Sequence, residues 1–213
     1  IRIIQNKETN ETSITFDAKD KFVYEIFSRY DNNGEIMDTA ITVLKPATKA
    51  DKLVVIDPGH GGSDPGAVYS GVKEKDINLD IALRLYDLLK SRGVNAYIIR
   101  DDDSFVGLYE RAYIANSLNA TLFLSIHNNA FNTKAYGTET LYYPSTRSDS
   151  GFNGQRFATI IQNKLVSSLG TLNRGIIERP GLVVLKATKM TAALAEVSFL
   201  DNDSDRQNLL SED

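Results

Sequence analysis

Cysteine is absent from the 213 residues of this chain. The absence excludes disulfide bonds, thiolate metal ligands and a cysteine nucleophile. It leaves the cellular compartment open, because chains without cysteine occur both inside and outside cells. Any metal ion that the chain binds must therefore be held by histidine, aspartate or glutamate.

Long apolar runs and an excess of basic residues are also missing. No uninterrupted apolar stretch reaches the roughly 18 residues of a membrane-spanning helix, so we expect no membrane span in this chain. The formal net charge is −4, which argues against a nucleic-acid partner, because phosphates demand a basic surface. The chain begins at Ile1 and shows no signal peptide, and we interpret it as a processed or trimmed part of a longer protein.

Only two histidines are present, and each stands just past a short apolar run. His60 lies in a glycine-rich loop after residues 53–58, and His127 follows residues 121–126. Ligands of α/β proteins bind beyond the carboxyl ends of buried strands. A single histidine is more often an ordinary surface or core residue, but two at two strand ends indicate a pair of metal ligands.

The first 45 residues differ in composition from the rest. Alternating apolar and polar residues over 13–17 are typical of a half-buried strand, and Asn32-Asn33-Gly34 predicts a hairpin turn. About 45 residues bury too little surface to be stable alone. We therefore interpret residues 1–50 as a β-rich segment and linker, either the tail of an upstream domain or an extension of the main domain, which spans residues 51–213. The strands predicted in this segment cover residues 1–7, 12–18, 22–31 and 35–45.

From residue 53 onward, predicted strands and helices alternate. Apolar residues recur every three or four positions in the predicted helices, and Ser204 and Gln207 form a capping box that would open a last helix. The other helices are expected over residues 76–92, 105–118 and 155–169. Strands are expected over residues 53–57, 94–100, 121–126, 139–143, 182–185 and 192–199. This order predicts an α/β fold with a twisted, mostly parallel central sheet and helices on both faces.

Two glutamates are candidates for the same site as the histidines. Glu74 directly precedes the first predicted helix, where the helix dipole alone would also favour a carboxylate. Glu196 interrupts the otherwise apolar stretch 192–200, although charged groups are rarely buried without a partner. Glu196 therefore lies either on an edge strand, facing solvent, or in a cleft beside a metal ion or a reacting proton.

Two histidines and one glutamate with an open fourth position would make a catalytic zinc site. Imidazole and carboxylate ligands suit Zn²⁺, whereas Mg²⁺ and Ca²⁺ prefer oxygen ligands. Zinc lowers the pKa of a bound water to about 7, and a second carboxylate can then take the proton of that water and pass it to a leaving amine. Glu196 fits this second role.

Five motifs that occur in order carry a resemblance to a known family. They are Val55-Ile56-Asp57-Pro58-Gly59-His60-Gly61-Gly62, Glu74-Lys75-Asp76-Ile77-Asn78-Leu79, Glu110-Arg111-Ala112-x-x-Ala115-Asn116, Ser125-Ile126-His127-Asn128-Asn129-Ala130 and Glu196-Val197-Ser198-Phe199-Leu200. Over about residues 52–210 the chain closely resembles the zinc-dependent N-acetylmuramoyl-L-alanine amidases, the amidase_3 family of bacterial cell-wall hydrolases. The resemblance implies that His60, Glu74 and His127 hold zinc and that Glu196 is the catalytic carboxylate.

The resemblance also implies an activity, a partner and a location. The activity would be hydrolysis of the amide between N-acetylmuramic acid and the L-alanine of the stem peptide. Peptidoglycan would be the partner, residues 51–213 the catalytic domain, and the location extracytoplasmic, in the cell wall, the periplasm or the medium. Two alternatives stay open: a wall-binding domain without turnover, which would be expected to lack a ligand or Glu196, and a zinc peptidase acting within the stem peptide.

The loops after the predicted strands indicate how a substrate would bind. Residues 61–64, 128–129 and 132–133 are small and polar. An apolar small-molecule site would instead be lined by aliphatic and aromatic side chains. We therefore expect an extended glycan-peptide to lie across the carboxyl edge of the sheet, with no dedicated apolar pocket.

Overall fold

The computed structural model describes residues 2–6, 8–9, 11–16, 18–30, 36–48, 50–144 and 151–211. The chain divides into two compact units, Ile1–Pro46 and Ala47–Asp213. The predicted turn Asn32-Asn33-Gly34 lies outside the described residues. Within the described ranges, no helix combines the length and the apolar character that a membrane span requires.

The first unit consists of two antiparallel strand pairs. β1 (Arg2–Asn6) pairs with β2 (Glu11–Thr15), and β3 (Val23–Tyr30) pairs with β4 (Ile36–Leu44). The four strands predicted from the sequence are therefore present. Every residue of β1 and β2 is exposed. Over the predicted half-buried strand 13–17, residues 13–15 are therefore exposed, Phe16 is half-buried and Asp17 lies outside the described residues. A ribbon of two strands has too little surface to bury either face by itself.

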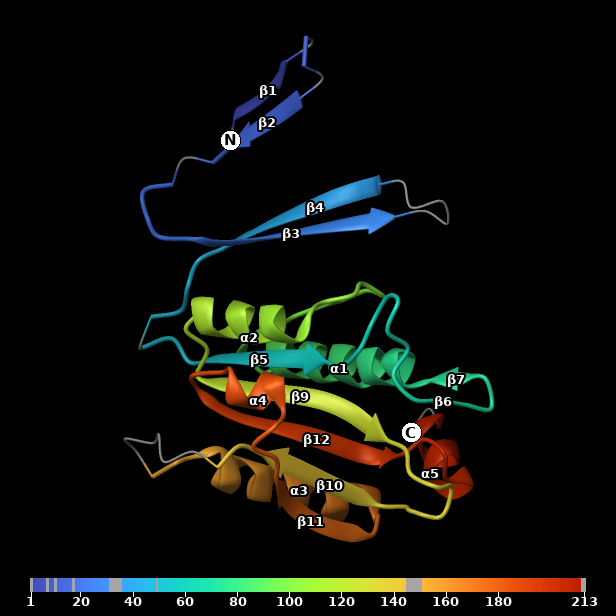
Figure 1. Cartoon of the computed structure of the whole chain (residues 1–213). Helices are drawn as coiled ribbons and strands as arrows, with labels where there is room; N and C mark the ends of the chain where they lie inside the picture. The colour runs from blue at the N-terminus through green and yellow to red at the C-terminus, as the bar shows by residue number, and fades with distance from the viewer. Residues whose placement is uncertain are drawn as a thin grey trace. The chain divides into compact units, whose positions relative to one another are not determined.

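The second unit is built on a six-stranded sheet with the order β11-β10-β12-β9-β5-β8 (Figure 1). Neighbouring strands are parallel except for the antiparallel pair β10–β12, which confirms the mostly parallel sheet. The strands are β5 (Leu53–Pro58), β8 (Asn95–Ile98), β9 (Leu122–Asn129), β10 (Thr138–Tyr142), β11 (Asn173–Glu178) and β12 (Thr191–Phe199). A small hairpin, β6 (Val68–Tyr69) with β7 (Val72–Lys73), stands between β5 and the first helix.

Helices cover both faces of the sheet. α1 (Glu74–Ser91) and α3 (Gly154–Leu169) pack on one face, where Ala82 and Phe157 join the buried apolar side chains of the central strands. α2 (Leu108–Ser117) and α4 (Val183–Lys186) contact each other on the other face. The fold class predicted from the sequence is confirmed.

Two predictions about individual elements are wrong, and one strand is present that the sequence pattern does not predict. Residues 182–185 form α4 rather than a strand, because a run of four apolar residues fits either structure. β11 was not expected, since Gly175 with its positive φ of 86° interrupts the strand pattern. The N-cap of the last helix, α5 (Asp203–Leu209), is Asn202 and not Ser204, and its side chain accepts hydrogen bonds from two backbone N–H groups of the first turn.

One edge of the sheet brings different strand ends together. β5, β9 and β12 run in the same direction, so their carboxyl ends share this edge, as the arrowheads in Figure 1 show. β10 runs antiparallel to β12, and β11 runs parallel to β10. These two strands therefore begin at the edge where β5, β9 and β12 end. Side chains from three strand ends and two strand starts therefore meet there.

Candidate metal centre

Three predicted ligands meet at this edge. His60 lies in the loop after β5, Glu74 is the first residue of α1, and His127 lies within β9. Their donor atoms all lie within 4.8 Å of one another. Glu74 bridges the two imidazoles, with Oε2 at 3.1 Å from Nε2 of His60 and Oε1 at 2.8 Å from Nδ1 of His127. The structure thus brings together residues that are up to 67 positions apart in the sequence.

Glycine makes the close approach of the two histidines possible. His60 itself has a positive φ of 61°, an unusual backbone conformation for a residue with a side chain. A Cβ atom on Gly59 would collide with the ring of His127, and one on Gly66 would collide with both Glu74 and His60. The glycines of this loop therefore leave the space that the three donors occupy.

Glu74 is a buried carboxylate that keeps its charge. Burial alone would raise its pKa, but hydrogen bonds and charge interactions with the two histidines hold the pKa well below its ordinary value. Its oxygens also accept hydrogen bonds from Ala67 N at 2.9 Å and from Asn78 Nδ2 and Asn128 N, both at 3.2 Å. The carboxylate is thus fixed in orientation between its two imidazole neighbours.

His60 is held by a second carboxylate that sequence reasoning did not assign to the site. Asp64 Oδ2 lies 2.8 Å from Nδ1 of His60, which leaves Nε2 facing Glu74. Burial lowers the pKa of His60, but the two carboxylates outweigh it and raise this pKa to about 9. Surroundings that favour a proton on His60 also favour a metal cation in its place. The only sequence signal for Asp64 was a carboxylate four residues after a histidine in the same loop.

The donor set fits a zinc ion. Zn–N and Zn–O distances of about 2.0–2.2 Å place the ligands of a tetrahedral ion about 3.3 Å apart. Two of the donor pairs lie at 2.8 and 3.1 Å, and the third lies within 4.8 Å. Small side-chain movements would therefore give all three residues ligand distances, and one coordination position would stay open. Orienting a ligating histidine through its other nitrogen, as Asp64 does, is usual for zinc sites.

Glu196 lies beside this donor set. It occupies β12 directly opposite His127 of β9, and β12 is an interior strand, so the edge-strand alternative is wrong. Its Oε2 atom is buried and has no hydrogen-bond partner among the described residues. Burial raises the pKa of Glu196 to about 7. A buried carboxyl with a free oxygen and a pKa near neutrality is suited to both accepting and donating a proton.

A cavity of about 530 Å³ opens in front of these residues. His60, His127 and Glu196 line it together with apolar side chains from the loop before α2, the first residue of α2, and the N-cap and first residues of α4. These apolar residues are Phe105, Val106, Leu108, Leu182, Val183 and Val184. The expectation that no apolar pocket borders the site is therefore wrong. The sequence pattern predicts a strand over residues 182–185, and the placement of residues 182–184 at the cavity depends on the helical turn of α4.

Two buried arginines hold the loop that carries His60. Arg111 donates from Nη1 to Asp57 Oδ1 at 2.6 Å and from Nη2 to the His60 carbonyl at 2.8 Å. Arg100 donates from Nε to the Pro58 carbonyl at 3.0 Å and from Nη2 to the Gly59 carbonyl at 2.9 Å. Sequence reasoning placed Arg111 in a family motif without a role, and nothing in the sequence indicated Arg100.

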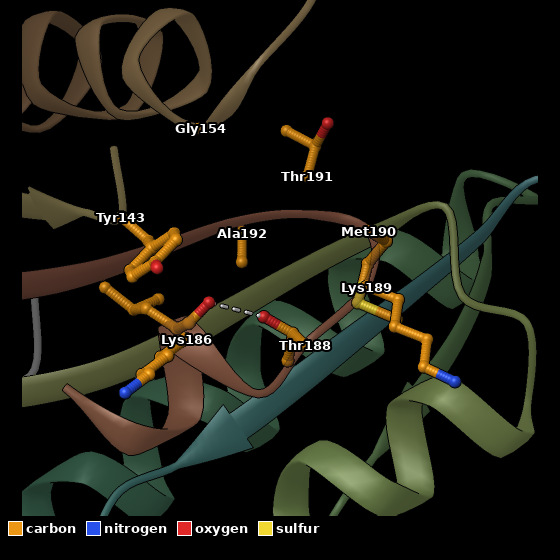
Figure 2. Close-up of a pocket in the computed structure, with 9 residues that line it drawn as sticks. Tyr143, Gly154, Lys186, Thr188, Lys189, Met190, Thr191 and Ala192 are labelled. Carbon is orange, nitrogen blue, oxygen red and sulfur yellow. Dashed lines mark hydrogen bonds between the residues drawn. The ribbon is translucent and has the colours of Figure 1, made fainter. Parts of the chain in front are cut away.

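A second cavity lies away from the donor set (Figure 2). It is lined by Tyr143, Gly154 and the stretch from Leu185 to the first residues of β12, so it lies at the opposite end of that strand from Glu196. Thr188 Oγ1 donates to the Leu185 carbonyl at 3.0 Å across its wall. With about 30 Å³ it has room for one or two water molecules only. None of its lining residues belongs to the His60, Glu74 and His127 donor set.

A His-Glu-His donor set with a buried carboxylate beside it is typical of zinc hydrolases. The chain belongs to the N-acetylmuramoyl-L-alanine amidase family (Amidase_3), whose model matches residues 54–213. The resemblance seen in the five sequence motifs is thereby confirmed.

Relatives and solved structures agree with this family. The uncharacterized protein YqiI of Bacillus subtilis is 45% identical over 76% of this chain and 77% of its own length. The N-acetylmuramoyl-L-alanine amidase LytC of the same species is 40% identical over 74% of this chain but only 31% of its own length. The crystal structure of an N-acetylmuramoyl-L-alanine amidase from Clostridium difficile 630 is 36% identical, with a TM-score of 0.70, over 76% of this chain and 87% of that one.

Proposed function

We propose that this chain is a zinc-dependent N-acetylmuramoyl-L-alanine amidase, with His60, Glu74 and His127 as the metal ligands and Glu196 as the catalytic carboxylate. Its substrate is peptidoglycan, and it therefore acts outside the cytoplasm. The observation that carries the proposal is the free, buried Oε2 of Glu196 next to three gathered donors. Family membership supports the choice of bond, the amide between the lactyl group and L-alanine.

A zinc ion bound there would polarise the scissile carbonyl and make a water molecule more acidic. The Glu196 carboxylate, which lines the cavity, accepts a proton from the water that attacks the carbonyl carbon. The same carboxyl then donates this proton to the amide nitrogen as the C–N bond breaks. The products are the lactyl carboxylate and a peptide with a free L-alanine amino group. The pKa of Glu196, about 7, suits both transfers near neutral pH.

Asp64 and the two arginines act through His60 rather than on the substrate. Asp64 fixes the ring of His60 so that Nε2 points to the donor set. Arg111 and Arg100 fix the backbone of the same loop. Their part is to keep the donors in position, which is the usual function of groups behind metal ligands.

The experiment is product analysis on purified muropeptides with the zinc-loaded protein. An amidase releases saccharide with an intact lactyl carboxyl together with a peptide that begins at L-alanine. Cleavage inside the stem peptide would instead establish the peptidase alternative, and binding without any product would establish the wall-binding alternative.

Glu196→Gln is the matched variant. It keeps the size and shape of the side chain but removes the proton acceptor, so we expect normal zinc content and a loss of activity of roughly 10²–10⁴-fold. Full activity of a zinc-loaded Glu196→Gln protein would remove Glu196 from the mechanism.

A further inference from the structure

A second polar cluster continues the row of site residues along the same edge. Glu139 at the start of β10 lies directly opposite Glu196 of β12. Its Oε1 accepts from Asn129 Nδ2 at 2.9 Å, and its Oε2 accepts from Arg174 Nε at 2.8 Å. The order across the edge is thus His127, Glu196, Glu139 and Arg174, on the four neighbouring strands β9, β12, β10 and β11.

Arg174 is held in position by its neighbours, but not all of its N–H donors are used in hydrogen bonds. Its guanidinium lies 4.8 Å from the ring centre of Phe199, and Nη1 reaches the Tyr136 carbonyl only at 3.5 Å. Within the described residues, no acceptor lies within hydrogen-bond distance of its Nη2. The side chain is 34% exposed, whereas Glu139 is 7% exposed. The pair therefore presents rigid N–H donors to solvent while its carboxylate stays buried.

The charges along the edge are distributed unevenly. On the far side of His60, the loops carry Asp64 and Asp103, of which Asp103 is paired with Lys75. Arg100 and Arg111 are buried and donate to backbone carbonyls and to Asp57. Arg174 differs from these two arginines because its side chain is partly exposed, so it offers N–H donors to a ligand although Glu139 balances its charge.

The spacing of the strands gives the length of the ligand. Neighbouring strands lie about 4.8 Å apart, so Arg174 is about 10 Å from Glu196 at the level of the backbone. An extended peptide covers about 3.3–3.6 Å per residue. A carboxylate on the second or third residue beyond the cleaved amide therefore reaches Arg174.

We propose that Arg174, held by Glu139, is a specificity determinant that binds a free carboxylate on the second or third residue of the stem peptide. The peptide then lies over β12, β10 and β11, and the saccharide lies over the apolar wall with Phe105 and Leu108. This inference rests on the proposed function for the position of the cleaved bond. A guanidinium recognises a carboxylate through paired N–H donors.

The test compares N-acetylmuramoyl tripeptides in which the side-chain or α-carboxylate of the second or third residue is free or amidated. We expect the native protein to prefer one free acid, and Arg174→Gln to lower this acid-to-amide ratio of kcat/KM by roughly 10- to 100-fold. Arg174→Lys keeps the charge without the paired donors, so its ratio falls in between. Equal ratios in the native protein and in Arg174→Gln would overturn the proposal.

Two further variants test whether the loss of preference in Arg174→Gln results from a disturbed structure rather than from the missing guanidinium. Arg174→Gln leaves the buried Glu139 charge unpaired, so the double variant Glu139→Gln/Arg174→Gln removes both charges and should fold better while still lacking the preference. Arg84→Gln removes an exposed ion pair on α1 and should leave the ratio unchanged. A folded double variant that retains the full preference would also overturn the proposal.

Binding measured by calorimetry on the zinc-loaded Glu196→Gln protein separates this inference from the proposed function. A preference for the free acid in binding, without cleavage by the native protein, would refute the amidase activity but support the Arg174 site. Equal binding of acid and amide would refute the Arg174 site even if the native protein is an active amidase.

Discussion

Replacing Arg111 by methionine tests whether the buried ion pair holds the metal loop. The side chains of Arg111 and Asp57 are 3% and 0% exposed, and their atoms Nη1 and Oδ1 lie 2.6 Å apart. Without the guanidinium, the one side-chain hydrogen bond that the Asp57 carboxylate keeps among the described residues is that from Ser125 Oγ at 2.7 Å. The His60 carbonyl loses the donor that lies 2.8 Å away. The variant therefore leaves the buried Asp57 carboxylate without its ion-pair partner, with Arg100 as a positive neighbour that is not hydrogen-bonded to it.

The expected loss follows from this geometry. Removing one partner of a buried ion pair costs about 3–5 kcal/mol, a large share of the roughly 5–15 kcal/mol that stabilises a typical domain. For a domain of this size, the loss corresponds to a decrease in Tm of about 6–20 °C. Urea unfolding of the metal-free protein, followed by circular dichroism, measures the free energy directly, and chelator competition measures the accompanying loss of zinc affinity.

Two controls decide whether the charge is the cause. Asp57→Asn/Arg111→Met removes both charges, and we expect it to recover much of the lost stability, because a buried pair can be replaced by neutral groups at little cost. Arg84→Met breaks an exposed pair with Asp80 and should cost less than about 1 kcal/mol. A loss below about 1 kcal/mol for Arg111→Met, or a double variant no more stable than the single one, would refute this reasoning.

Four other outcomes are expected. His127→Ala should lose most of the zinc affinity, because two ligands cannot enforce the tetrahedral site; full zinc content by metal analysis would contradict it. The pKa of His60 is about 9 in the metal-free protein, so zinc must displace a proton from this residue when it binds. The apparent zinc affinity should therefore rise about tenfold per pH unit from about pH 6 to 8. An affinity that does not change with pH in chelator competition would contradict this. Gly59→Ala should weaken zinc binding, since its Cβ meets the His127 ring. A shortened chain beginning at Ala50 should retain zinc and turnover, whereas a folded, zinc-loaded but inactive product would show that residues 1–45 shape the substrate site.

The sequence predicted the parts of this molecule that depend on local pattern. Apolar periodicity gave α1 and α3 nearly to the residue, and Gly170 with φ of 65° ends α3 in the left-handed conformation. The family motifs named the three donors that the fold brings within 4.8 Å. The local pattern failed over residues 182–185, where only contact with α2 and the sheet favours a helical turn.

The residues that support the site from behind or beside the donor set could not be predicted from the sequence, and the reason is different. Asp64, Arg100 and Arg174 act through contacts with residues that are distant in the sequence or lie across a turn. Nothing in the types or spacing of these residues distinguishes them from solvated surface charges. Their function depends on burial and on neighbouring strands, which only the folded structure defines.

Because β10 runs antiparallel to β12, the sheet edge that carries the site has two parts, one made of strand ends and one made of strand starts. The metal-binding part consists of strand ends and the glycine loop, where a Cβ atom at Gly59 or Gly66 would collide with the donor residues. The part beyond Glu196 consists of the first residues of β10 and β11. The segments 130–137 and 170–172 directly precede these two strands. Insertions or exchanges in these two segments would alter the surroundings of Glu139 and Arg174, and no metal-ligand candidate lies in either segment. Under the proposed binding mode, exchanging these two segments would change substrate preference and leave the three metal-ligand candidates in place.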